Sequence, residues 1–123
     1  MIASLQALAA ALAADEVLVD DIVARLGGEA EDLGSNVVVT TPAVEGVTQV
    51  NVVRDGDAPA FMTLELAAPL GTGELEAEFG EPRRVYPDHK GLPVDLLFSM
   101  PVAITLVAAE GADGVRRVTL RRD

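Results

Sequence analysis

The stretch "VTQVNVVRDGDAPAFMTLEL" (residues 47–66) decides the fold, because it holds two alternating segments on either side of a turn. In its first segment, Val50 and Val52 alternate with Gln49 and Asn51. A side-chain period of two is the signature of a β-strand with one face against a core and one face toward water. The segment therefore predicts a strand in an antiparallel sheet.

The second segment returns with the same period. Met62 and Leu64 alternate with Thr63 and Glu65. Between the two segments stands an Asp-Gly pair at 55–56, and its glycine accepts the positive φ that tight turns use. An Asp-Gly pair between two alternating runs is a strong hairpin signal. We expect Thr63 and Glu65 to point away from the core.

Further strands are expected on both sides of this hairpin. The segments that carry them are "NVVVTTP" (36–42), "VDLLFS" (94–99), "AITLVAA" (103–109) and "VRRVTLRR" (115–122). Together with the hairpin they predict a mostly antiparallel sheet of about six strands.

Helices are expected at the N-terminus and in the middle of the chain. Residues 2–14 are rich in Ala and Leu, residues 19–26 end at a Gly-Gly pair, and residues 73–79 end before Gly80. The sequence therefore predicts an α+β fold with two N-terminal helices and one short middle helix.

The first helix carries no charged residue. Leu5, Leu8 and Leu12 lie at helical spacing and form one apolar stripe. Since a solvated helix normally has a charged outer face, we expect burial against the sheet and interpret these leucines as candidate interaction residues for a second subunit.

The stretch "GTGELEAEFGEP" (71–82) allows three interpretations. A phosphate loop needs backbone amides with a nearby Lys, but this stretch has four glutamates and no Lys. Glu74 and Glu78 stand at i and i+4, the spacing of a solvated helix face as well as of paired catalytic carboxylates. We favour a short helix whose Leu75 and Phe79 face the core.

The two halves of the chain repeat their landmarks in the same order. A helix ending "ARLGGE", a strand, "TTP", a strand, "RDGD" and a strand are followed by a helix ending "AEFGEP" and the same succession. Either residues 15–70 and 71–123 are two tandem helix plus three-strand units within one domain, or turns recur at this interval in any such meander.

The segments "LEAEFGEPRRV" (75–85) and "VARLGGE" (23–29) resemble the helix and following strands of two families. These are the small-protein-A outer-membrane lipoproteins and the tandem-unit β-lactamase-inhibitor-protein fold. The resemblance implies helices laid on an antiparallel sheet and a function in binding other proteins. The chain departs from these families in having no lipobox cysteine and no aromatic-rich face, so no functional residue is carried over.

Composition excludes several function classes. The net charge is −11, with eleven acids and two arginines in residues 1–72. Nucleic acid and membrane surfaces are disfavoured as partners, because both bind mainly through Lys and Arg. The absence of cysteine removes disulfides and thiolate chemistry. We expect a cytoplasmic protein, with a periplasmic or secreted location left open.

Few residues suit catalysis or metal binding. His89 is the only histidine, and it stands in "YPDHKG" between turn residues. No spacing motif joins it to other metal ligands, so no metal and no cofactor are predicted. An enzyme using His89 with nearby acids remains the least favoured alternative.

The last predicted strand carries three candidate interaction residues, Arg116, Arg117 and Arg121. Arginine is enriched at interfaces, but charges on a terminal strand also protect a sheet edge from unwanted pairing.

These observations favour a non-enzymatic protein-binding or regulatory module. Its partner would be a basic protein or a second copy of the chain, in a homodimer through residues 2–14. A small-molecule-binding domain is the alternative.

Overall fold

The predicted hairpin forms the longest pair of strands in the fold. In the computed structural model, which describes residues 1–34 and 36–123, β3 (Val47–Asp55) and β4 (Ala58–Leu70) pair antiparallel. Asp55 pairs with Ala58, so the two-residue turn Gly56–Asp57 closes this hairpin, and Gly56 has φ +64°. As expected from the alternation, Val50, Val52 and Met62 are buried.

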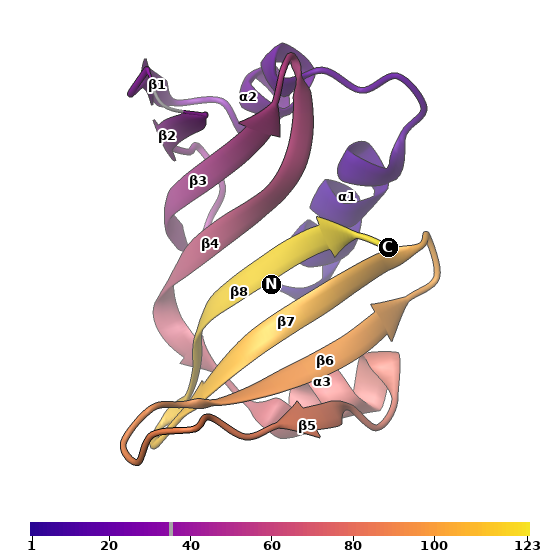
Figure 1. Cartoon of the computed structure of the whole chain (residues 1–123), viewed down its shortest axis with the longest axis vertical. Coiled ribbons are helices and arrows are strands. Elements are labelled where there is room, and N and C mark those ends of the chain that lie inside the picture. The colour runs from indigo at the N-terminus through magenta and orange to yellow at the C-terminus, as the bar shows by residue number, and fades with distance from the viewer. Residues whose placement is uncertain (35) are drawn as a thin grey trace.

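The sheet grows outward from this hairpin on both sides (Figure 1). Among the described residues the strand order is β1-β2-β3-β4-β8-β7-β6-β5, and every pairing is antiparallel. The other strands are β1 (Glu29–Asp32), β2 (Val37–Thr41), β5 (Arg83–Val85), β6 (Val94–Met100), β7 (Ile104–Gly111) and β8 (Gly114–Arg122). The α+β class with an antiparallel sheet is thus confirmed.

The prediction of about six strands is too low, since the described residues form eight. The two strands that it missed are β1 and β5, which lie at the two edges of the sheet. Every residue of both strands is exposed, and their sequences are "EAED" and "RRV". Neither has an apolar alternation, because each is held by pairing with one neighbouring strand and faces no core.

The position of the last strand also differs from the sequence-based interpretation. β8 lies between β4 and β7 in the middle of the sheet, so its arginines do not protect an edge. Each of the two units, residues 15–70 and 71–123, has one helix followed by four strands rather than three, and their final strands, β4 and β8, pair with each other.

Three helices, α1 (Ile2–Ala13), α2 (Val19–Leu26) and α3 (Thr72–Phe79), cover one face of the sheet in the described part of the chain. They contact β8, β4 and β6 respectively. Their inward residues Leu5, Ile22 and Leu75 are fully buried. Phe79 packs edge-on against Phe98, with 6.4 Å between the ring centroids.

The ends of α2 and α3 match the glycines at which the sequence predicted them to stop, and the start of α3 is held by a side-chain contact. Gly27 and Gly80 follow α2 and α3 with positive φ. Thr72 is the first residue of α3 and makes no cap hydrogen bond. Its hydroxyl instead donates to Oε2 of Glu110 on β7 (2.9 Å), which fixes the start of α3 against the sheet.

Candidate functional site

In the described residues, no helix covers the face of the sheet opposite α1, α2 and α3. We call it the open face. The strand registers arrange its side chains in rows that cross the sheet. The middle row contains Glu31, Val39, Asn51, Thr63, Thr119, Val107, Leu97 and Arg83, in order from β1 to β5.

Two shorter rows flank the middle row. The first contains Gln49, Glu65, Arg117, Ala109, Asp95 and Val85. The second contains Val37, Val53, Phe61, Arg121, Thr105 and Ser99. None of these side chains is buried, whereas the residues that alternate with them in the central strands form the core.

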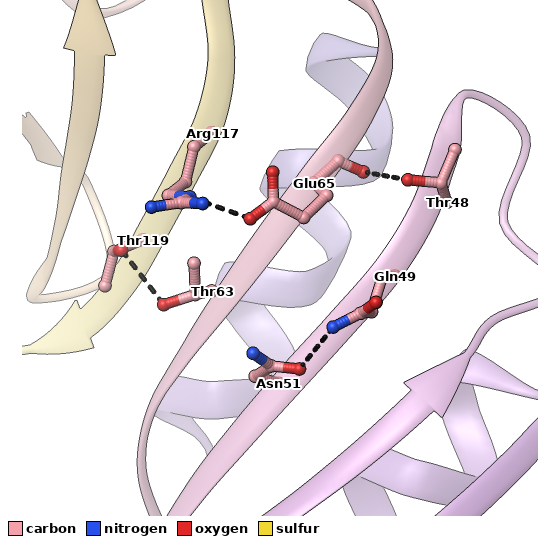
Figure 2. Close-up of polar contacts among 7 residues, drawn as sticks. All are labelled: Thr48, Gln49, Asn51, Thr63, Glu65, Arg117 and Thr119. Carbon is pink, nitrogen blue, oxygen red and sulfur yellow. Dashed lines mark hydrogen bonds and ion pairs between the residues drawn. The ribbon is translucent and has the colours of Figure 1, made fainter.

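Polar contacts hold the centre of the open face in place (Figure 2). The hydroxyls of Thr63 and Thr119 lie 3.1 Å apart, and Nε of Arg117 donates to Oε1 of Glu65 (2.7 Å). Nε2 of Gln49 donates to Oδ1 of Asn51 (2.9 Å). In this view, all of these side chains lie in front of the strands and a helix passes behind them. The two cross-strand pairs, together with the Gln49–Asn51 contact along β3, fix the positions of these side chains.

A shallow depression of about 250 Å³ lies at one end of the open face. It is lined by Glu65, Pro93, Ala109, Gly111, Asp113, Gly114, Arg116 and Arg117. Arg116 donates through Nε and Nη2 to Oδ2 of Asp113 (3.1 and 2.6 Å). This hydrogen bond lowers the pKa of Asp113 and raises that of Arg116, so the pair stays ionised at physiological pH.

The arginines predicted from the sequence come together on this face. Arg117 and Arg121 stand in its rows, and Arg116 lines its depression. Their strand is central, so they sit in the middle of the face and not at its rim.

The leucines predicted as interaction residues do not lie on the open face. Leu5, Leu8 and Leu12 are 0%, 3% and 0% exposed and belong to the chain's own core, on the other side of the sheet. The residues that α1 exposes include Ala3, Gln6 and Ala10. The uncharged character of the helix therefore reflects packing on the sheet together with an alanine-rich outer side.

The remaining candidates lie apart from the open face or from one another. His89 is exposed in the β5–β6 connection, and the described residues contain no group of three acidic or histidine side chains placed to hold a metal. Glu74 and Glu78 are exposed on α3, where Glu78 accepts a hydrogen bond from Gln6 of α1 (2.8 Å). At the start of α3, Glu74 lies in the first turn and Glu110 bonds Thr72, an arrangement unfavourable to phosphate.

Some residues of the open face were not predicted from the sequence. Phe61, which is 37% exposed, and Thr119 were not singled out, although the alternation in residues 47–66 and 115–122 placed them on the outward side. The partner of Arg117 was also missed, because a cross-strand pair depends on register and register is not written in either strand alone.

No helix in the described part of the chain combines the length and apolar character needed to cross a bilayer.

Comparison with known proteins gives a likeness of fold. No family model matches the sequence, and no curated protein matches it. The chain is similar to the crystal structure of a DUF4309 family protein (YjgB) from Bacillus subtilis subsp. subtilis str. 168, with a TM-score of 0.63 and 10% identity. The match covers 96% of this chain and 97% of that one. At this identity the likeness concerns the fold alone.

Proposed function

We propose that the protein is a non-enzymatic protein-binding module whose open face receives a partner protein. The observation that carries this proposal is the uncovered face itself, which crosses all the described strands and combines apolar, hydroxyl and arginine side chains. Aromatic residues and arginines dominate the energetics of protein interfaces. Phe61 and Arg121 are neighbours on paired strands within this face.

Charge distribution supports the same surface. The alternation, the lining of the depression and the hydrogen bond from Thr105 to Asp123 give the open face six acids (Glu29, Glu31, Glu65, Asp95, Asp113, Asp123) and four arginines (Arg83, Arg116, Arg117, Arg121). The other fourteen acids and five basic residues lie elsewhere in a chain of net charge −11. The open face is therefore nearly neutral, and its partner needs a mixed surface rather than the basic one expected from composition.

The alternative functions have weaker support. The depression of about 250 Å³ is smaller than the ~300–1,000 Å³ typical of small-molecule sites. Enzymatic use of His89 would need a second group oriented on its imidazole, and no hydrogen bond of this side chain occurs among the described residues.

Affinity capture with matched variants tests the proposal. Thr63→Arg places a long charged side chain at the centre of the open face, and Ala10→Arg places the same side chain on the exposed side of α1. A protein bound by the wild type from native lysate at low salt should be retained by Ala10→Arg. The amount of the same protein captured should be at least tenfold lower with Thr63→Arg.

Mass spectrometry of the captured proteins provides the readout, with circular dichroism to show that both variants fold. Loss of the partner with Ala10→Arg but not with Thr63→Arg would show that the partner binds the helices and not the open face. Fractionation of the native cells would test the proposed cytoplasmic location in the same material.

A further inference from the structure

The order of the strands has an internal symmetry. β4 and β8 pair at the middle of the sheet, with three strands beyond each of them. We call the line between β4 and β8 the seam. A twofold axis that runs along the seam and lies in the plane of contact would stack two copies face to face. It would set each strand over the strand at the mirrored position of the other copy: β1 over β5, β2 over β6, β3 over β7 and β4 over β8.

We propose that a second copy of this chain occupies the open face about this axis. The inference rests on the proposed function and names its partner. Most soluble oligomers are closed and symmetric, and a twofold interface must be complementary to itself. The charged positions of the open face and the central pairs beside the seam meet this requirement.

The middle row ends in an acidic residue on one side of the seam and in a basic residue on the other. Its two ends are Glu31 on β1 and Arg83 on β5, so the axis brings the carboxylate of one copy to the guanidinium of the other. Val39 meets Leu97 and Thr63 meets Thr119, whereas Asn51 lies over Val107, a polar side chain over an apolar one.

The flanking rows follow the same rule. In the first, Glu65 of one copy meets Arg117 of the other, which adds an intermolecular contact to the pair already present within each chain. In the second, Phe61 meets Arg121. In the three rows the axis joins two pairs of charged residues, Glu31 with Arg83 and Glu65 with Arg117, and both pairs are of opposite sign.

Size and charge are compatible with such a pair. Seven inter-strand spacings of about 4.8 Å and about six residues along the central strands give an upper bound of roughly 34 by 20 Å, or about 700 Å² per copy, because the edge strands β1 and β5 have only four and three residues. Stable interfaces bury about 800 Å² per partner. Because the rest of the molecule carries most of the net charge of −11, the open face is where two copies repel each other least.

A double-mutant cycle between Glu31 and Arg83 tests the inference. Within one chain these residues lie on the outermost strands, about 34 Å apart by the same spacing, so neither can contact the other. Any coupling between them must therefore arise between copies. The measured quantity is the dimer dissociation constant of the full-length chain, from sedimentation velocity over a range of concentrations.

Glu31→Arg and Arg83→Glu should each weaken the dimer about tenfold, since each substitution acts twice in a twofold pair. The double variant should return to within about twofold of the wild type. Glu16→Arg, at an exposed position away from the open face, is the control: it makes the net charge less negative by two units, as Glu31→Arg does, and should leave the dimer unchanged or slightly tighter.

Two results would overturn the inference: a wild type that stays monomeric at millimolar concentration, or a double variant in which the two losses add. If either occurs while a different protein is still lost with Thr63→Arg, the proposed function stands and only the second copy as partner is excluded. If neither a different protein nor a second copy of the chain binds the open face, both proposals fail.

Discussion

Leu5→Ala is expected to lower the free energy of unfolding by about 2 to 5 kcal/mol. Leu5 is 0% exposed in the core between α1 and the sheet, so truncation leaves a cavity as well as losing transfer energy. Gln6→Ala is the matched control on the same helix: Gln6 is exposed and gives up only its hydrogen bond to Glu78. Urea denaturation of both variants measures the difference.

This expectation changes how a charged substitution in α1 should be interpreted. Glutamate at position 5 or 8 would place a carboxylate inside the core and unfold the chain, so a loss of association in such variants would not report on an interface. A nearly neutral effect of Leu5→Ala would mean that α1 does not pack on the sheet as described.

Gly28→Ala is expected to cost about 3 kcal/mol or more. Gly28 joins α2 to β1 with φ +69°, and a Cβ atom there would lie 2.0 Å from the carbonyl oxygen of Thr41. That oxygen belongs to the backbone of the paired strand β2, so it cannot move aside without breaking the β1–β2 pairing.

Gly56→Ala separates the strain of a positive φ from the clash of an added Cβ atom with the neighbouring backbone. Gly56 has a similar φ of +64°, but nothing lies within 4 Å of an added Cβ. Its substitution should cost only the left-handed backbone penalty of about 1 to 2 kcal/mol. Equal melting temperatures for the two variants would contradict the close approach of α2's end to β2.

Local signals in the sequence predicted the centre of the fold well. The period-two alternation of residues 47–66 gave the β3–β4 hairpin and its outward residues, and the glycines at 27 and 80 gave the ends of α2 and α3. These features depend on neighbours within a few residues, which is why a single sequence reveals them.

Long-range pairing set the features that were missed. The edge strands β1 and β5 have no periodicity of their own, and the central place of β8 depends on the pairing of Leu64 with Val118 and of Leu106 with Leu120. A terminal strand looks like an edge strand until these contacts are known. The same pairing moved the arginines of β8 from the expected rim to the middle of the candidate site.

The leucines of α1 show the converse problem. An uncharged amphipathic helix predicts burial, but the sequence cannot say whether the burying surface is the chain's own sheet or another molecule. The structure assigns Leu5, Leu8 and Leu12 to the chain's own core, and the open face takes their place as the candidate interaction surface.

The proposal that the open face is where protein binds is tested most directly by the reactivity of single cysteines. The chain has no natural cysteine, so Val107→Cys on the open face and Ala10→Cys on α1 each introduce one thiol. Maleimide labelling rates are compared without partner and with saturating partner, whether that is a captured protein or unlabelled wild-type chain. We expect at least a fivefold slower reaction at position 107 and no change at position 10; protection at position 10 with none at position 107 would contradict the account.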